Sequence, residues 1–351
     1  MAAITVKNRQ ILLKDYVTGS FVESDMTFHD GTCLLQLQEG TNDILVKNLY
    51  ISPDPFLRGR MQKRTNSYVD SFVPGSVITG FGVSQVVMSN NPNFSKGDFV
   101  TGYTGWEDFS VIKSSGFLRI IPAIGFPLTY FLGVLGMPGL TAYAGFHEVC
   151  SPKEGDQVFV SAASGAVGQL VGQFAKLLGC YVVGSAGSNE KVELLKNTLG
   201  FDEAFNYREE IDLDATLKKY FPKGIDIYFE NVGGEMLEAV LNNINVFARI
   251  AVCGMISRYD SAEPYSIKNL HLLIPMRAKM QGLIATDFSH LYPEVTERVG
   301  LWLKEKKIVY IEDLIEGLEN APRAMLDVLR GKNVGKKIVK LSDPYTSLEA
   351  L

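Results

Sequence analysis

The pattern of apolar and polar residues changes near residue 130. The first third holds short runs in which apolar and polar residues alternate with a period near two, which is typical of half-buried strands. Glycines at the ends of several runs predict tight corners between these strands. We therefore expect a hairpin-rich, barrel-like β unit with strands in Ile44–Ile51, Phe81–Val87, Asp98–Tyr103 and Trp106–Ile112.

Beyond residue 130, short β-branched runs alternate with segments of helical spacing. Asp156–Ser161 is followed by a glycine-rich turn and then by Gly165–Leu178, which has apolar residues on one helical face. Such alternation favours a doubly wound parallel sheet. Later segments continue it, with strands in Cys180–Val183, Ile225–Phe229, Arg249–Cys253 and Lys279–Ile284 and helices in Lys191–Leu199 and Glu235–Asn243.

The tail of the chain is again β-like, ending in Val334–Leu341. An all-β start, an α/β middle and a β-like end indicate an inserted middle domain. The predicted fold class is α/β. It combines a Rossmann domain at residues 130–302 with a β-rich domain built from residues 1–129 and 303–351.

Composition excludes several classes of protein. The 351 residues include 34 Lys and Arg against 39 Asp and Glu, a formal charge of −5 that argues against nucleic acid as a partner. The longest apolar stretch, Phe126–Phe146, is interrupted by Gly133 and by Gly136–Gly139, so we expect a buried helix–turn–helix and no membrane span. The first ten residues lack the apolar core of a signal peptide.

Cysteine and histidine are sparse and widely separated. The four cysteines form no C-x-x-C pair, and the four histidines show no pair at helical spacing. Neither pattern suits a disulfide framework or a metal site. We therefore expect no bound metal and a cytoplasmic, reducing compartment.

The most informative segment is the turn after the strand at 156–161. It aligns with the G-x-G-x-x-G dinucleotide fingerprint as Ala163-x-Gly165-x-x-Gly168, with Ala166 and Val167 between the last two positions. A glycine at position 165 allows the backbone to approach a pyrophosphate, and one at 168 allows the helix to pack close to the sheet. The exposed amides of the helix N-terminus then favour the anionic group.

The second strand indicates which cofactor is used. NAD sites place an acidic residue about 20 residues beyond the fingerprint, on the ribose 2′-hydroxyl. Here the strand ends in Gly184–Ser188, no acid occurs before Glu190, and Lys191 follows. Small polar residues and a lysine suit a 2′-phosphate, so the sequence favours NADPH.

Four longer strings of the sequence are informative together, Leu135–Gly145, Ala162–Gly172, Asp226–Gly234 and Ile250–Ser257. They resemble the plant double-bond reductases, which are 2-alkenal and enone reductases of the zinc-independent medium-chain dehydrogenase/reductase superfamily, related to prostaglandin reductase and pulegone reductase. The resemblance covers essentially the whole chain and implies NADPH, a homodimer and a small enal or enone substrate.

The resemblance also implies roles for individual residues. It puts the 2′-phosphate near Gly187, Lys191 and Tyr207, and Tyr259 at the substrate as the catalytic residue, in contact with the cofactor as well. The remaining implied cofactor contacts are Pro55, Asn231, Cys253, Leu283, Ile284, Ala285 and Asn333.

One departure from the family pattern concerns the substrate. Relatives typically carry Asp-Pro-Tyr where this chain has Asp54-Pro55-Phe56, so a hydroxyl expected at the substrate is absent. Phe56 can still pack against an apolar substrate. The physiological acceptor is therefore less constrained by the sequence than the type of reaction.

The implied reaction is reduction of an α,β-unsaturated carbonyl compound. Hydride is delivered from NADPH to the β-carbon, and negative charge builds on the carbonyl oxygen, where Tyr259 or the ribose hydroxyl of the cofactor stabilises it. The α-carbon is then protonated by Tyr259 or by water. Two alternatives stay open at this point. One is an NADPH quinone oxidoreductase, and the other is a non-catalytic binding protein on a reductase fold.

Overall fold

The computed structural model describes residues 4–113, 117–261, 263 and 265–345. The chain divides into two compact units, each of which is described by itself. Unit 1 comprises residues 1–132, 313–332 and 337–351, and unit 2 comprises residues 133–312 and 333–336. The second division lies ten residues beyond the predicted boundary at 302/303. Residues 303–312 stay with unit 2 because the side chains of Gln169 and Gln173 hydrogen-bond the backbone of Ile311 and Val309.

Unit 1 is built around a seven-stranded sheet with the order β14-β15-β3-β4-β5-β7. Strand β6 returns to pair with the first half of β3, while β15 pairs with its second half. The strands are β3 (Ile44–Ile51), β4 (Thr79–Ser89), β5 (Phe99–Gly105), β6 (Phe109–Ile112), β7 (Arg119–Ile120), β14 (Glu312–Glu316) and β15 (Lys336–Lys340), with an outer hairpin of β1 (Thr5–Leu13) and β2 (Met26–Leu34) and helices α1 (Leu57–Arg60) and α10 (Ala321–Leu329).

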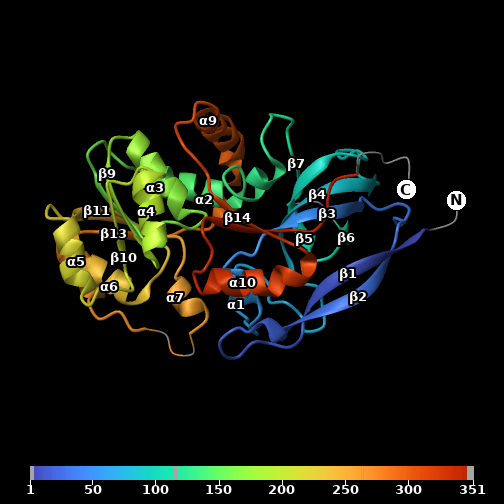
Figure 1. Cartoon of the computed structure of the whole chain (residues 1–351), viewed down its shortest axis with the longest axis horizontal. Helices are drawn as coiled ribbons and strands as arrows, with labels where there is room; N and C mark the ends of the chain where they lie inside the picture. The colour runs from blue at the N-terminus through green and yellow to red at the C-terminus, as the bar shows by residue number, and fades with distance from the viewer. Residues whose placement is uncertain (1–3, 114–116, 262, 264, 346–351) are drawn as a thin grey trace. The chain divides into compact units, whose positions relative to one another are not determined.

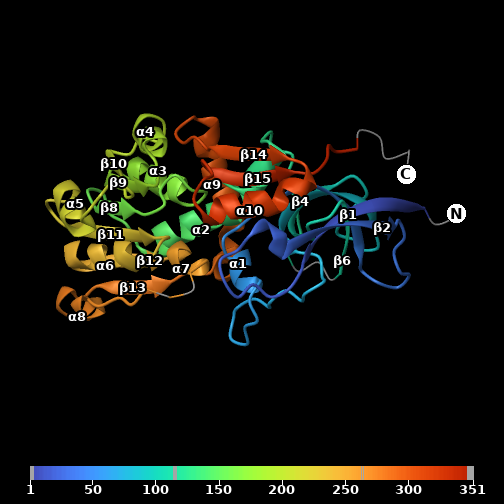
Figure 2. The same ribbon diagram turned by 60° about the horizontal axis from the view of Figure 1, so that its bottom comes forward.

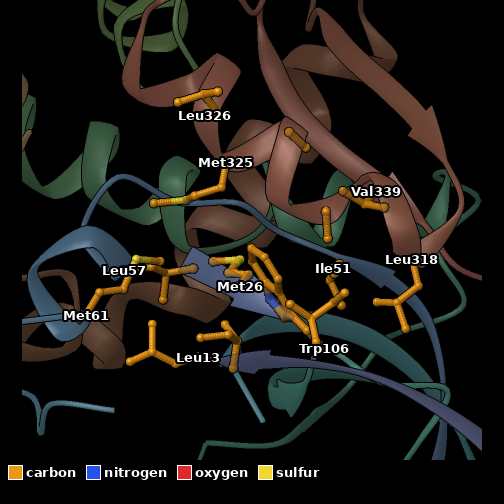
Figure 3. Close-up of a cluster of buried hydrophobic side chains, with 14 of the residues drawn as sticks. Leu13, Met26, Ile51, Leu57, Met61, Trp106, Leu318, Met325, Leu326 and Val339 are labelled. Atoms are coloured by element: carbon orange, nitrogen blue, oxygen red, sulfur yellow. The ribbon is translucent and has the colours of Figure 1, made fainter. Parts of the chain in front are cut away.

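The core of unit 1 joins residues from both parts of the chain. Leu13 and Trp106 of the first part lie in one buried cluster with Leu318, Met325 and Val339 of the last part, and all five are fully buried (Figure 3). Burying these side chains removes apolar surface from water, which is the main driving force for joining the two segments. The sequence prediction of a β-rich domain built from both chain ends is confirmed, and its main sheet includes antiparallel pairs throughout β3, β4 and β5.

Unit 2 is a six-stranded parallel sheet of order β10-β9-β8-β11-β12-β13. Numbered along the chain this is 3-2-1-4-5-6, the order of a Rossmann domain. Figure 2 shows the six strand labels in this order down the unit. The strands are β8 (Gln157–Val160), β9 (Tyr181–Ala186), β10 (Glu203–Asn206), β11 (Ile225–Glu230), β12 (Ile244–Val252) and β13 (Lys279–Gly282).

Helices connect these parallel strands and cover the sheet (Figure 1). The apolar run at 126–146 forms a short 3₁₀ turn, Leu128–Leu132, and then a buried helix, α2. The helices are α2 (Met137–Ala144), a π-helical turn at Gly145–Val149, α3 (Gly168–Leu177), α4 (Asn189–Asn197), α5 (Leu213–Tyr220), α6 (Gly234–Asn243), α7 (Ile256–Tyr259), α8 (Leu273–Met276) and α9 (Tyr292–Lys304).

Candidate functional site

The predicted cofactor residues of unit 2 follow the carboxyl ends of its six parallel strands. Tyr207 follows β10, Gly187 follows β9 and the fingerprint turn follows β8. On the other side of the turn, Asn231 follows β11, Cys253 follows β12 and Leu283 follows β13. In open α/β sheets ligands bind at this edge, next to the point where the strand order reverses. That point lies between β8 and β11, at the fingerprint turn.

The fingerprint turn brings the start of α3 very close to the end of β8. Ala162 has a positive φ of 46°, and its carbonyl accepts a hydrogen bond from the backbone nitrogen of Gly165 at 3.0 Å. A Cβ placed on Gly168 would lie 2.7 Å from this same carbonyl oxygen and 2.7 Å from Cα of Ala163. Since real Cβ atoms do not approach so closely, the first residue of α3 has to be glycine.

Alanine fits the first fingerprint position because the neighbouring strand provides the space. Ala163 is fully buried and donates its backbone N–H to the Ser185 carbonyl at 2.9 Å. Opposite it, β9 carries Gly184, where an added Cβ would lie 2.7 Å from Cβ of Ala163. The methyl group of Ala163 therefore occupies the space that a side chain at position 184 would fill.

A short segment from the end of the chain also belongs to this turn. Gly335 forms a parallel bridge with Gly165, and its backbone nitrogen donates to the carbonyl of Ser164 at 3.1 Å. The side-chain nitrogen of Asn333 donates to the carbonyl of Gly335 at 2.7 Å. Asn333, which is 168 positions beyond Gly165 in the sequence (333 minus 165), is thus held next to the fingerprint turn.

The residues predicted for the 2′-phosphate lie together beyond β9 and β10. Ser188 caps α4 by accepting from the backbone nitrogen of Lys191, and the Lys191 side chain is buried. An added Cβ on Gly187 would lie 3.3 Å from the ring and hydroxyl of Tyr207 and 3.3 Å from Nε of Arg208. Glycine leaves room here for both side chains, and a larger residue would require Tyr207 or Arg208 to shift by a few tenths of an ångström.

Arg208 is a candidate that the sequence reasoning missed. Its guanidinium carbon lies 5.8 Å from the Tyr207 ring centroid, so Lys191 is accompanied by a second positive charge beside Gly187. Arginine near the second and third strands is a common partner of a cofactor 2′-phosphate. In the sequence, the feature that could have indicated this role is the position of Arg208 directly after Tyr207, a predicted contact of the 2′-phosphate.

On the opposite side of the turn, a buried polar network fixes Asn231. The Asn231 backbone nitrogen donates to Oγ of Ser161 at 3.0 Å, and its side-chain nitrogen donates to the Ser161 carbonyl at 2.8 Å. The fully buried Glu230 accepts from the Tyr228 hydroxyl at 2.9 Å and from the backbone nitrogen of Gly233 at 2.8 Å. Burial raises the pKa of Glu230 above its ordinary value despite these donors.

Cys253 follows β12 beside this network. Its backbone nitrogen donates to the carbonyl of Glu230 at 2.9 Å. Burial, and secondarily the nearby Glu230 carboxyl group, raises the pKa of the Cys253 thiol to about 12. A thiol with this pKa stays protonated near neutral pH, so Cys253 contributes a neutral surface rather than a nucleophile.

The last predicted group follows β13. The backbone nitrogen of Leu283 donates to the Val252 carbonyl at 3.1 Å, and Ile284 and Ala285 lead into the 3₁₀ segment Ala285–Leu291. The Leu283 side chain is buried against Gly145, where an added Cβ would lie 2.7 Å away from it. Leu283, Ile284 and Ala285 therefore form an apolar group at the β13 end of the row of site residues that follow the six strands.

Tyr259 ends the short helix α7 beyond β12. Its hydroxyl oxygen accepts a hydrogen bond from the backbone nitrogen of Met255 at 3.3 Å and lies 3.0 Å from an added Cβ on Gly254. The phenol is therefore held at the turn that directly follows Cys253. Because the oxygen accepts this backbone N–H, the hydroxyl group has a fixed position at the end of α7.

Pro55 and Phe56 belong to unit 1, in the turn between β3 and α1. Ser52 donates to the Asp54 carboxylate at 2.7 Å within this turn. The Phe56 ring packs edge-on against Phe81, with the centroids 6.3 Å apart. Pro55, Phe56 and Phe81 are all half-buried.

The arrangement in unit 2 fits an NADPH molecule. Backbone amides and a required glycine occur at the fingerprint, two positive side chains occur at one end of the row, and apolar residues occur at the other end. No group of three or more His, Cys, Asp or Glu side chains capable of holding a metal occurs in the part of the chain that the structure describes. In the same residues, no helix is long and apolar enough to cross a bilayer.

Comparisons with known proteins agree with this geometry. Two family models match, the N-terminal domain of oxidoreductase over residues 9–120 and the zinc-binding dehydrogenase over residues 166–300. A 2-alkenal reductase (NADP(+)-dependent) from Nicotiana tabacum is 58% identical over 96% of this chain and 98% of its own length. A (+)-pulegone reductase from Mentha piperita is 53% identical over 96% of this chain and 99% of its own length.

A solved structure also matches nearly the whole chain. CurA from Vibrio vulnificus, in complex with NADPH, is 40% identical and superposes with a TM-score of 0.88. The match covers 96% of this chain and 100% of that protein.

Proposed function

This chain belongs to the medium-chain dehydrogenase/reductase superfamily, among its NADP(H)-dependent reductases of activated carbon–carbon double bonds, and we propose that α,β-unsaturated aldehydes and ketones are its substrates. The observation that carries the proposal is the row of site residues along the carboxyl edge of the sheet. It has two positive side chains, Lys191 and Arg208, at one end and the Tyr259 hydroxyl at the other.

We assign the cofactor contacts by their order along this row. Gly187, Lys191, Tyr207 and Arg208 bind the 2′-phosphate, because positive and small polar groups meet there. The turn residues Ala163, Gly165, Ala166, Val167 and Gly168 bind the pyrophosphate at the start of α3, with Asn333 beside them. The nicotinamide end is formed within unit 2 by Asn231, Cys253, Tyr259, Leu283, Ile284 and Ala285. The contact of Pro55 with the cofactor stays a prediction from the sequence.

NADPH supplies the hydride when it is bound. The residues of this chain orient the reactants and stabilise charge. Tyr259, with its oxygen already accepting the Met255 backbone N–H, donates a hydrogen bond to the carbonyl oxygen on which negative charge develops. The packing of Phe56 against the apolar part of the substrate stays a prediction from the sequence. The neutral Cys253 thiol adds no negative charge that would oppose the enolate.

The direct test follows the absorbance of NADPH against a panel of acceptors. A linear 2-alkenal, benzylideneacetone, pulegone and a simple quinone are each tested with NADPH and with NADH. Turnover of an enal or enone with a strong preference for NADPH is the expected result. Turnover of the quinone alone would replace the proposal with a quinone oxidoreductase. Binding of NADPH without turnover of any acceptor would favour a non-catalytic binding protein.

We further propose a homodimer in the cytoplasm. Strand β13 is an edge of the six-stranded sheet, and exposed apolar side chains lie on neighbouring elements, including Val246, Phe247 and Ile274. An unpaired edge next to exposed apolar side chains is a common site of association. Light scattering during size exclusion tests the dimer, and a monomer at micromolar concentration would contradict it.

The four free cysteines support a reducing compartment, which fluorescence of a tagged chain tests.

A further inference from the structure

Helix α3 buries two glutamine side chains, one turn apart, that pair with a backbone segment far along the chain. Gln169 is fully buried, and Gln173 is 5% exposed. Oε1 of Gln169 accepts from the backbone nitrogen of Ile311 at 2.8 Å, and its Nε2 donates to the Ile311 carbonyl at 3.1 Å. Gln173 pairs with Val309 in the same way, at 2.8 Å and 2.9 Å. Each glutamine thus satisfies both backbone groups of one residue, as a neighbouring strand would.

The residue that Gln169 holds is also in contact with the segment that carries Asn333. The Ile311 carbonyl accepts a second hydrogen bond, from the backbone nitrogen of Lys336 at 2.9 Å. Gly335 lies against the same carbonyl so closely that an added Cβ would overlap its oxygen. The positive φ of Gly335, 79°, also favours glycine at this position.

These contacts close a ring around the fingerprint turn, entirely within unit 2. The backbone nitrogen of Gly335 donates to the carbonyl of Ser164, and that of Gln169 donates to the carbonyl of Gly165, both at 3.1 Å. From the turn, the ring runs through Gln169 to Ile311, then to residues 335–336, and back to the turn. Asn333 is attached to this ring by its hydrogen bond to Gly335.

We propose that Gln169 is a positioning residue for the cofactor, because its grip on Ile311 fixes residues 333–336 against the fingerprint turn. Gln169 therefore determines where Asn333 meets the pyrophosphate part of the cofactor. The inference rests on the proposed function and on its assignment of Asn333 to the cofactor. NADPH and NADH share the pyrophosphate, so the contribution of Gln169 is the same for both.

The test measures the dissociation constants of NADPH and NADH by calorimetric titration of the full chain. Gln169→Met keeps the length of the side chain and removes both hydrogen bonds with Ile311. We expect it to weaken the binding of both cofactors by the same factor, about 3- to 10-fold, the size of one neutral hydrogen bond lost at the cofactor. If Gln169→Met does not fold, Gly335→Ala interrupts the same ring from the other side and should give the same result.

Gln173→Met is the matched control on the same face of α3. It removes the two bonds with Val309 and a third, from Nε2 to the carbonyl of Gln169 at 2.8 Å. Lys336 and Gly335 contact Ile311, which lies two residues beyond Val309. Gln173→Met should therefore lower the melting temperature about as much as Gln169→Met, but leave both dissociation constants within about 2-fold of the wild type.

A double-mutant cycle shows whether Gln169 acts through Asn333. Asn333→Ala should itself weaken the binding of both cofactors. The double variant Gln169→Met/Asn333→Ala should then bind them within about 2-fold of Asn333→Ala alone, whereas the losses from two independent sites would multiply.

The outcomes separate this inference from the proposed function. Cofactor binding in Gln169→Met that equals the wild type would overturn the inference alone. Equal losses in Gln169→Met and Gln173→Met, or losses that multiply in the double variant, would do the same and leave Gln169 a purely structural residue. A wild-type chain that bound neither cofactor would instead refute the proposed function, and this inference with it.

Discussion

His147 should make the stability of the protein sensitive to mild acid. Its ring lies in the π-helical turn of unit 2 among aromatic side chains, 4.5 Å from the Tyr143 ring centroid and 5.2 Å from that of Phe146. Its Nε2 atom is buried without a hydrogen-bond partner among the described residues. Burial, and secondarily the positive charge of Arg298, lowers the pKa from 6.5 to about 4, and Glu294 opposes the shift.

The size of the effect follows from this shift. Well above pH 6.5 the His147 ring is neutral in both the folded and unfolded states, so its protonation does not change the free energy of unfolding. As the pH falls through 6.5, the unfolded chain gains a proton that the folded protein does not take up until about pH 4, and stability is lost across that window. The full difference of about 2.5 units corresponds to about 3.4 kcal/mol, of which about 2 kcal/mol is lost between pH 7.5 and pH 5.

Urea unfolding at pH 7.5 and pH 5.0 measures this loss. His147→Phe keeps an aromatic ring among the same neighbours but cannot be protonated, so its free energy of unfolding should fall by about 2 kcal/mol less than that of the wild type over this pH change. His271→Gln, at an exposed histidine, is the matched control and should behave like the wild type. Equal losses in His147→Phe and the wild type would show that His147 does not carry the acid sensitivity.

Three further predictions concern the cofactor unit. Lys191→Ala should weaken NADPH binding by about 1–3 kcal/mol and leave NADH binding nearly unchanged. The control Lys196→Ala, on the exposed face of α4, should affect the binding of neither cofactor. Calorimetric titration with both cofactors measures these values, and equal losses of NADPH and NADH binding in Lys191→Ala would contradict the phosphate assignment. Tyr259→Phe should lower kcat on enones about 10²- to 10⁴-fold with the NADPH dissociation constant unchanged, and full retention of turnover would remove its role. Gly172→Ala should lower the melting temperature, because the new methyl group overlaps the Phe201 ring at a cost of about 1–3 kcal/mol that exceeds the gain in helix propensity, and Phe201→Leu in the same chain should restore it.

Five of the six Rossmann strands could be predicted because each is a local pattern in the sequence. The apolar run Ile225–Phe229 and the turn at 163–168 are set by neighbouring residues, and the structure places β11 and the fingerprint within a residue or two of the predicted positions. The hairpin β1–β2 and the strand β10 were not predicted, because β10 has only two apolar residues, Ala204 and Phe205, and β1 has no regular alternation.

Parts of the site depend on contacts that no local pattern contains. The tolerance for alanine at position 163 arises from Gly184 on another strand, and Gly172 is required by Phe201 on a third segment. Arg208 becomes a candidate only when Gly187 and Tyr207 are seen beside it. In unit 1, the contact between the Phe81 and Tyr103 rings likewise depends on the register that sets these two residues opposite each other.

The bridge between Gly165 and Gly335 has a consequence for how this protein can be divided and recombined. A gene fragment for residues 133–312 would encode every strand of the parallel sheet and still omit the segment that completes the fingerprint turn. The backbone N–H of Gly335 and the side chain of Asn333 come from a piece of chain that is inserted between two parts of unit 1. Exchanging cofactor preference between relatives by domain grafting would therefore require residues 333–336 to be transferred together with the sheet, as a second and separate graft.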